Sequence, residues 1–298
     1  MEIISVVPRG YCQGVVRAIQ IAKDTAQKYP DQKITMLGMI VHNSYVVEAC
    51  HKAGISFIED PKRTRLELLD DIEEGVVIFT AHGVSDAVRQ KAQAKGLTIV
   101  DATCHDVRKT HDVIKNHHGD IIYIGKQNHP EAEAALGLCE RVHLVSTIAD
   151  IDTLPPLHDV LITNQTTLSI LDTDRIIQAC LAKYPNAQTA EEICNATRIR
   201  QEAVMKIKNA DLLIVVGDPR SNNSRQLAET GRKAGIPESI LISSVEDLHE
   251  EMIQKKDRIA VTSGSSTPNI LTQQVIDVLK DYAATGIFHQ TKVDPAVL

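Results

Sequence analysis

The stretch LLIVVGDPRSNNS at residues 212–224 shows the unit on which the fold is built: a short aliphatic run followed by a polar turn. A helix-like pattern comes next, over Arg225 to Ala234. Continuous aliphatic runs of this length, separated by helical segments, are typical of buried parallel strands in α/β proteins. The stretch therefore predicts a strand–turn–helix unit of a parallel sheet.

The same unit returns along the chain. Six aliphatic runs each lead into a polar or glycine-containing turn: 34–37, 76–79, 121–124, 160–162, 212–216 and 259–261. Open α/β sheets bind their ligands in the loops at the carboxyl ends of the strands. We therefore expect the binding groups in these turns, which contain His42, His82, His129, Thr166, Ser221 and Ser266.

Three cysteines recur at a regular spacing that matches these units. Cys12, Cys104 and Cys194 are separated by 92 and 90 residues, and two strand–turn units follow each of them. We therefore predict three similar parallel-sheet α/β modules around a pseudo-threefold axis, each with one thiol and two polar loops. The modules are placed at residues 13–103, at residues 104–190, and at residues 1–12 with 191–285; residues 286–298 form a C-terminal tail of unassigned role.

Composition limits the classes of function. The chain has 298 residues, 43% of them hydrophobic, and a net charge of −7. It has no Lys/Arg run of the kind that nucleic-acid binding proteins carry, and no apolar run near the roughly 18 residues of a membrane span. Six cysteines without a secretion signal are too few for a disulfide scaffold. We therefore expect a cytoplasmic protein with free or metal-bound thiols.

The spacing of the cysteines indicates which metal they suit. A structural zinc site normally takes paired ligands about two to four residues apart, and ferredoxin-like sites take closely spaced cysteines. The chain has neither arrangement. Three isolated thiolates suit an iron–sulfur cluster with one iron open to substrate. Spacing alone leaves the alternative that a lone cysteine is a small buried hydrophobe, which we favour for Cys180.

The polar turns have two compatible interpretations. The Ser221–Ser224 and Gly264–Thr267 segments each precede an apparent helix, where hydroxyls and backbone N–H groups cap the helix or hold an anion. Neither segment is a nucleotide-binding fingerprint. A loop histidine is usually only solvated, but three at equivalent turns are candidate anion donors.

Glu131 is the candidate acid. Pro130 and the neighbouring acids also read as an ordinary helix start. A glutamate among neutral donors and bound anions would nevertheless favour its protonated form, as a proton donor requires. Thr166 is expected to face the same centre, where its hydroxyl can relay a proton.

These segments together closely resemble the 4-hydroxy-3-methylbut-2-enyl diphosphate reductase family of the non-mevalonate isoprenoid pathway. The similarity runs in order over nearly the whole chain: PRGYCQGV (8–15), VHN (41–43), TAHGVS (80–85), DATC (101–104), HPE (129–131), NQTTLS (164–169), RQEAV (200–204), VVGDP (215–219), SNNS (221–224) and STP (266–268).

The resemblance implies more than spacing does. It implies a trefoil of three modules around a [4Fe–4S] cluster ligated by Cys12, Cys104 and Cys194. The substrate diphosphate would be held by His42, His82, His129, Ser221, Asn222, Asn223 and Ser266. Glu131 would supply the proton that lets the allylic hydroxyl leave as water, with Thr166 positioning the alcohol. Ferredoxin or flavodoxin would deliver electrons singly, and isopentenyl and dimethylallyl diphosphate would result.

The chain departs from the family pattern at a few positions. His105 follows Cys104 where proline is usual, Arg225-Gln226 replaces the usual Asn-Arg, and Ser263 and Ser265 replace small apolar residues. Asn222 stands where many members have a second serine. Two rival functions remain, a zinc hydrolase or lyase and a non-enzymatic module that binds a phosphorylated ligand. The sequence does not decide between a monomer and a homodimer, and it does not give the product ratio.

Overall fold

The computed structural model of the chain describes residues 1–293. The chain divides into two compact units. Unit 1 comprises Met1–Cys12, His42–Val46 and Asn195–Leu298, and unit 2 comprises Gln13–Val41 and Val47–Cys194. Of the tail expected at residues 286–298, residues 294–298 lie outside the described part.

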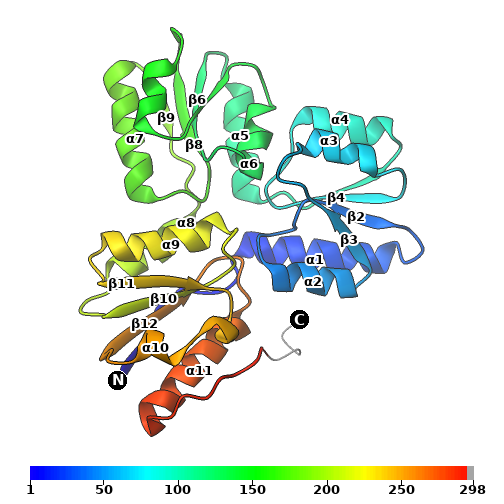
Figure 1. Cartoon of the computed structure of the whole chain (residues 1–298). Coiled ribbons are helices and arrows are strands. Elements are labelled where there is room, and N and C mark those ends of the chain that lie inside the picture. Colours follow the sequence, from blue (N-terminus) through cyan, green and yellow to red (C-terminus); the bar gives the residue numbers. More distant parts are fainter. Residues whose placement is uncertain (294–298) are drawn as a thin grey trace. The chain divides into compact units, whose positions relative to one another are not determined.

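Within residues 1–293, parallel strands form three separate four-stranded sheets (Figure 1). The first sheet, in unit 2, contains β2 (Ile34–Leu37), β3 (Ile55–Ile58), β4 (Val76–Phe79) and β5 (Thr98–Asp101). The second, also in unit 2, contains β6 (Ile121–Ile124), β7 (Val142–Val145), β8 (Leu161–Asn164) and β9 (Gln188–Ala190). The third, in unit 1, contains β1 (Glu2–Ser5), β10 (Leu212–Val216), β11 (Glu238–Ile242) and β12 (Arg258–Ser263).

The three sheets share one strand order. It is β3-β2-β4-β5 in the first sheet, β7-β6-β8-β9 in the second and β11-β10-β12-β1 in the third. The N-terminal strand β1 therefore holds the place in the third sheet that β5 and β9 hold in the other two. The expected fold class of three parallel-sheet α/β modules is confirmed.

Helices and short 3-10 turns connect the strands. They are α1 (Gln13–Lys28), α2 (Ser44–Lys52), α3 (Arg65–Leu68), η1 (Leu69–Asp71), α4 (Asp86–Ala94), α5 (His105–Asn116), α6 (Pro130–Leu136), η2 (Ile148–Thr153), α7 (Ile170–Lys183), α8 (Asn195–Met205), α9 (Asn222–Lys233), η3 (Val245–Asp247), α10 (Glu250–Ile253) and α11 (Asn269–Thr285). Several of the polar turn residues cap these helices, since the side chains of Ser85, Ser169 and Ser221 each accept a backbone N–H bond. No described helix combines the length and the apolar character needed to cross a bilayer.

The aliphatic runs form strands because both faces of each central strand are buried. In β10, Leu212, Ile214 and Val216 pack with α11 on one face of the third sheet. Leu213 and Val215 pack with α8 and α9 on the other face (Figure 1). Successive side chains of a strand point to opposite faces, so a strand covered on both sides needs an unbroken apolar run.

The strand order also places the polar turns. In each sheet the two central strands are neighbours: β2 and β4, β6 and β8, and β10 and β12. In the first two sheets the connections that follow them run to opposite edges; in the third, β10 connects to β11 at one edge, and the N-terminal β1 pairs with β12 at the other. Such a topological switch point is where open α/β sheets bind ligands. The six turns expected to carry binding groups are the loops at these points, after β2 and β4, after β6 and β8, and after β10 and β12.

Gly231 tests how closely α9 packs on the third sheet. A Cβ built on Gly231 would lie 2.4 Å from Leu213 Cδ2 and 2.8 Å from Ser239 Oγ. An alanine normally stabilises a helix relative to glycine by about 1 kcal/mol. At this position we expect Gly231→Ala to lower the free energy of unfolding instead, by about 1–3 kcal/mol of overpacking.

Urea unfolding of the metal-free protein measures the effect. Lys233→Ala, on the exposed side of the same helix, is the control and should change stability by less than about 0.5 kcal/mol. A stabilised Gly231→Ala variant would contradict the close packing.

Candidate functional site

Cys12, Cys104 and Cys194 occupy equivalent places in the three modules. Each lies after the strand at the same edge of its sheet, and a helix begins at the next residue: α1, α5 and α8. The backbone N–H of each cysteine donates to a carbonyl in the loop after the neighbouring third strand: Cys12 to Ser265 at 3.1 Å, Cys104 to Ala81 at 3.0 Å and Cys194 to Thr166 at 3.1 Å. The same backbone bond thus fixes all three.

The surroundings of these thiols suit metal ligands. All three are half-buried and form no disulfide, whereas Cys50 and Cys180 are buried. Burial raises the pKa of the Cys180 thiol to about 11, which fits its place in the core of the second sheet. A helix N-terminus favours nearby negative charge, so a thiolate at the start of α1, α5 or α8 is well placed. Isolated thiolates of this kind fit an iron–sulfur cluster.

Two hydrogen bonds hold the Cys12 loop through Gly10. The Gly10 N–H donates to Ser263 Oγ at 2.8 Å, and the Arg200 guanidinium donates to the Gly10 carbonyl at 2.7 Å. Gly10 has a φ of +74°, and a Cβ there would lie 1.7 Å from Asn269 Oδ1, so only glycine fits. Ser263, a departure from the family pattern, therefore anchors this loop, and Arg200 was not expected to take part.

Cys104 is followed by His105, the other departure next to a thiol. Cys104 is the N-cap of α5 and His105 its first residue, with an exposed side chain. Proline is favoured at the first position of a helix because no N–H is needed there, and a histidine fits the same backbone. The loss of proline thus leaves the turn at Cys104 formed.

Glu131 lies at the start of α6 and is almost completely buried, with 2% of its surface exposed. Its Oε1 accepts the Thr166 backbone N–H at 2.6 Å, and its Oε2 accepts the Thr166 hydroxyl at 3.1 Å. His129 caps the helix, because its Nδ1 accepts the Glu131 backbone N–H at 3.1 Å. The structure thus brings three residues expected at the site into one hydrogen-bonded group within unit 2.

Burial makes Glu131 a weaker acid. Desolvation of the carboxylate is the main cause, with a smaller contribution from Asp106, and together they raise the pKa of Glu131 to about 7. The two Thr166 hydrogen bonds oppose this rise. A carboxyl group with a pKa near 7 can hold and release a proton under physiological conditions.

His82 lies beside His129 in unit 2. Their ring centroids are 5.6 Å apart and the rings are nearly perpendicular, at 83°. Thr80 Oγ1 lies 3.4 Å from His82 Nδ1. Because His129 accepts a bond at Nδ1, its neutral form carries the proton on Nε2. The two histidines, the buried acid and Thr166 thus form one group of expected site residues within unit 2.

A second group of expected site residues lies within unit 1: Ser221, Asn222, Asn223, Ser266 and His42. Ser266 Oγ lies 3.1 Å from the His42 carbonyl and 3.4 Å from Ser221 Oγ. Ser221 caps α9, so backbone N–H groups of its first turn and side-chain hydroxyls lie together. Such an arrangement is suited to an anion.

Asn223 has a structural role beside the expected binding role. Its Oδ1 accepts the Ser265 backbone N–H at 3.1 Å, and its Nδ2 donates to Thr197 Oγ1 at 3.1 Å. Ser265 is also the residue whose carbonyl accepts the Cys12 N–H. Asn223 thus ties the anion-binding turn to the Cys12 loop. Asn222 Oδ1 lies 3.5 Å from an Arg225 guanidinium nitrogen. Arg225, which departs from the family pattern, therefore contacts the expected binding turn.

Asp218 was not expected to take part in this group of residues. Its Oδ2 accepts the backbone N–H of Ser44, which follows His42 by two residues, at 3.0 Å. Its carboxylate also pairs with Arg220 at 2.7 Å. The motif VVGDP contains Asp218, but the partner lies 174 residues away, so only the folded chain reveals the contact.

The family described as "LytB protein" matches residues 3–280 of the chain. A 4-hydroxy-3-methylbut-2-enyl diphosphate reductase of Brevibacillus brevis is 47% identical over 95% of this chain and 92% of its own length. A Bacillus cereus protein of the same name is 46% identical over 95% of this chain and 91% of its own length.

Solved structures agree with the sequence relatives. The E-1-hydroxy-2-methyl-but-2-enyl-4-diphosphate reductase from Plasmodium falciparum is 33% identical, with a TM-score of 0.87 over 94% of this chain and 88% of that chain. A structure of (E)-4-hydroxy-3-methyl-but-2-enyl diphosphate reductase, the terminal enzyme of the non-mevalonate pathway, is 26% identical, with a TM-score of 0.64 over 94% of this chain and all of that chain.

Ser263→Ala tests the anchoring of the Cys12 loop. The variant removes the acceptor of the Gly10 N–H and leaves a buried donor unpaired, so we expect a loss of about 1–3 kcal/mol of unfolding free energy. Ser265→Ala is the control, because Ser265 acts through its backbone carbonyl and the substitution keeps it. Equal stability of the two variants in urea would show that the Ser263 hydroxyl does not stabilise the Gly10 loop.

The raised pKa of Glu131 predicts a pH-dependent stability. The folded protein holds this proton more tightly than the unfolded chain, so the contribution is fully present below the ordinary pKa of 4.5 and is lost as pH rises through about 7. It amounts to on the order of 3 kcal/mol. Between these pH values the unfolding free energy of Glu131→Gln should fall less steeply than that of the native metal-free protein. Glu140→Gln, an exposed control, should keep the native slope.

Proposed function

The chain belongs to the LytB protein family, and from this we propose that it reductively removes the hydroxyl group of (E)-4-hydroxy-3-methylbut-2-enyl diphosphate. The reaction consumes two electrons and two protons and yields water with isopentenyl or dimethylallyl diphosphate. It would be the last step of the non-mevalonate route to isoprenoid precursors. The names of relatives that share nearly half of its residues over nearly all of its length support this assignment.

The strongest support for this proposal is that the three thiols have the same structural environment in their modules. Cys12, Cys104 and Cys194 share one place in the module, one backbone bond and one position before a helix. We propose that they ligate a single [4Fe–4S] cluster with one iron not bound by cysteine. When bound, the cluster supplies one-electron reduction and an iron that accepts an oxygen ligand.

Glu131 is proposed as the proton donor to the departing hydroxyl. A leaving hydroxide must take up a proton, and a buried carboxyl with a pKa of about 7 is protonated in a large fraction of molecules at neutral pH. Thr166 holds the carboxyl by two hydrogen bonds, so its position is fixed before substrate binds. Preorganised groups of this kind lower the cost of reorganisation during reaction.

The Thr166 hydroxyl is proposed to pass the proton on. A hydroxyl donates one hydrogen bond and accepts others, so Thr166 can receive a proton at its oxygen while it gives its own. In the resting protein this hydroxyl donates to Glu131 Oε2. Its direction would reverse when Glu131 is protonated, which makes the pair a two-way relay.

The diphosphate is proposed to bind to neutral donors. These are the side chains or turns of His42, His82, His129, Ser221, Asn222, Asn223 and Ser266. Asn223 is proposed to act mainly by shaping the turn, because both ends of its amide already contact the protein. Hydroxyl, imidazole and helix-end N–H groups hold a phosphate without fixing it as rigidly as a bidentate arginine does.

The electrons are proposed to come one at a time from ferredoxin or flavodoxin, in a reducing cytoplasm where thiolate ligands persist. Such carriers form weak, short-lived complexes with small interfaces. Every residue named in this proposal belongs to one chain.

The proposal is tested on protein purified without oxygen. Iron, sulfide and the visible spectrum are measured for the native chain and for Cys12→Ser, Cys104→Ser and Cys194→Ser. We expect a brown protein with about four irons per chain that dithionite bleaches, and loss of this cluster in each variant. Cys139→Ser, a half-buried thiol away from any helix start, is the control and should keep the cluster.

The decisive readout is turnover of the allylic diphosphate with reduced methyl viologen, with both products measured. A colourless protein that binds zinc and hydrolyses the diphosphate would show that the chain is a zinc hydrolase and not a reductase. Ligand binding that survives all three cysteine substitutions, with no turnover, would indicate a binding module.

A further inference from the structure

The helix that carries Glu131 has little packing of its own. α6 is seven residues long, and three of its buried side chains are alanines: Ala132, Ala134 and Ala135. Alanine buries little apolar area, so these contacts contribute little energy against a rotation of the helix. Besides the two bonds from Thr166, the orientation of Glu131 therefore depends on contacts made by other residues of α6.

Glu133 makes such a contact, two residues after Glu131. Its Oε1 accepts the backbone N–H of Arg65 at 2.6 Å, and its Oε2 lies 3.4 Å from the Arg65 guanidinium. Arg65 is the first residue of α3, in the module of the first sheet. One carboxylate is thus held at both oxygens by a single residue of the neighbouring module.

The Arg65 guanidinium is buried, with 6% of the residue exposed. Burial lowers the pKa of Arg65, and Glu133 and Glu59 oppose this shift. A buried charge that loses its partner is strongly destabilising, so the pair tolerates little displacement. The Glu133 side chain is 32% exposed, so it is the buried Arg65 end that distinguishes this pair from ordinary surface ion pairs, which contribute little.

Arg65 also contacts the loop after β2. A Cβ built on Gly38, the first residue of that loop, would lie 2.7 Å from a terminal nitrogen of the guanidinium. The far end of α6 meets the same module, since a Cβ on Gly137 would lie 2.5 Å from Ser85 Cβ. Ser85 caps α4 three residues after His82. The middle of α6, at Glu133, and its C-terminal end, at Gly137, therefore both rest on the module that carries His82.

We propose that Arg65 is a positioning residue, which sets the rotation of α6 through Glu133 and thereby places Glu131 against Thr166 and His129 beside His82. Its consequence for catalysis rests on the function proposed above. The positioning itself concerns only unit 2 and does not require a bound cluster.

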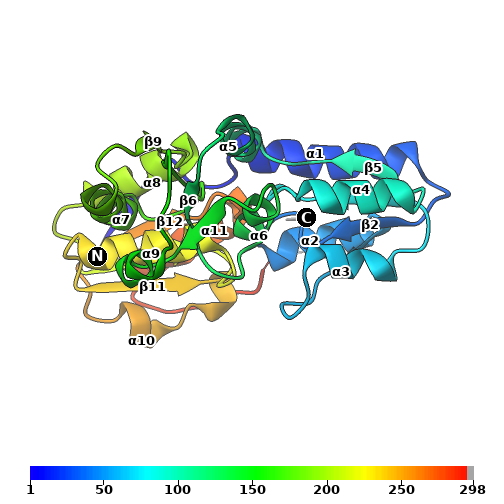
Figure 2. The same cartoon turned by 90° about the horizontal axis from the view of Figure 1, so that it is seen from above.

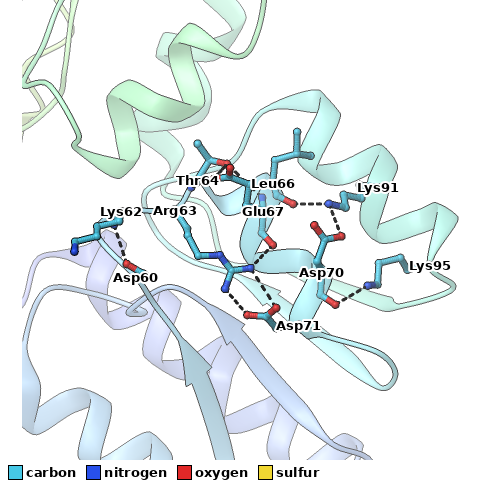
Figure 3. A network of polar contacts seen from close by, with 10 residues as sticks. All are labelled: Asp60, Lys62, Arg63, Thr64, Leu66, Glu67, Asp70, Asp71, Lys91 and Lys95. Atoms are coloured by element: carbon cyan, nitrogen blue, oxygen red, sulfur yellow. Dashed lines mark hydrogen bonds and ion pairs between the residues drawn. The ribbon is translucent and has the colours of Figure 1, made fainter.

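A matched control lies two residues away. Arg63 pairs with Asp71 at the surface, in the network that also contains the Lys91–Asp70 pair (Figure 3). This network joins α3 to α4, which lie side by side (Figure 1, Figure 2). Arg63→Met removes the same kind of charge from the same segment without touching α6.

The first measurement is the titration of the Glu131 carboxyl in the metal-free protein. Infrared difference spectra against Glu131→Gln isolate its protonated C=O band. In Arg65→Met, rotation of α6 admits water to Glu131 and removes the desolvation that dominates its titration. We expect the midpoint to fall towards the ordinary value by at least about one pH unit, a tenfold change. The Arg63→Met midpoint should equal the native one.

The second measurement uses the loaded enzyme. Arg65→Met should lower kcat about 10- to 100-fold, because misplacing a catalytic group costs this much, with a smaller change in KM. Arg65→Lys should recover part of kcat, since lysine keeps the charge but lacks the planar fork. Glu133→Gln should resemble Arg65→Met, and the double variant should lose less than the sum of the two.

The outcomes separate the two proposals. A native enzyme without reductase activity would overturn the proposed function, while the metal-free titration would still decide the role of Arg65. An unchanged Glu131 midpoint in Arg65→Met would overturn the positioning role, even if the variant were less stable. If Arg65→Met does not fold, the Glu131 titration is measured in Arg65→Lys and Glu133→Gln instead. Native midpoints in both variants would overturn the positioning role of Arg65.

Discussion

One backbone hydrogen bond, made three times, fixes the three cysteines that are proposed to hold the cluster. The N–H of each cysteine that starts a helix donates to a carbonyl in the loop after the adjacent third strand. Because both groups belong to the backbone, the bond constrains where the cysteine lies without constraining which side chains surround it. The polar turns at the switch point can therefore differ among the modules while the thiol keeps its place.

The sequence predicts the central strands well and the peripheral ones poorly, for a physical reason. β2, β4, β6, β8, β10 and β12 are nearly or fully buried, so they appear as mostly aliphatic runs. The strands at the edges are less buried, and Ile55–Ile58 has two exposed positions. β9, with the sequence QTA, has no apolar run at all and was not expected.

The candidate site shows the same division. Residues in the turns at the carboxyl ends of central strands were identified from the sequence, because the turns follow recognisable runs. The residues that hold those turns were not. Arg200 reaches Gly10 across 190 positions, and Ser263 reaches it across 253. Glu131 was expected to favour its protonated form because of neighbouring anions, whereas burial is the main cause. Burial depends on the whole fold, so local sequence gives no measure of it.

The place of β1 has a consequence for how the protein is made. This strand pairs in register with β12, so that Ser5 lies opposite Val261. A ribosome releases Cys12 among the first residues, yet the strand and the loop that hold it are among the last to be synthesised. Cys12 therefore meets these partners only after β12 has been made, while Cys104 and Cys194 find theirs within one contiguous stretch. Assembly of the proposed cluster, which uses all three thiols, would have to follow the synthesis of β12 and Ser265.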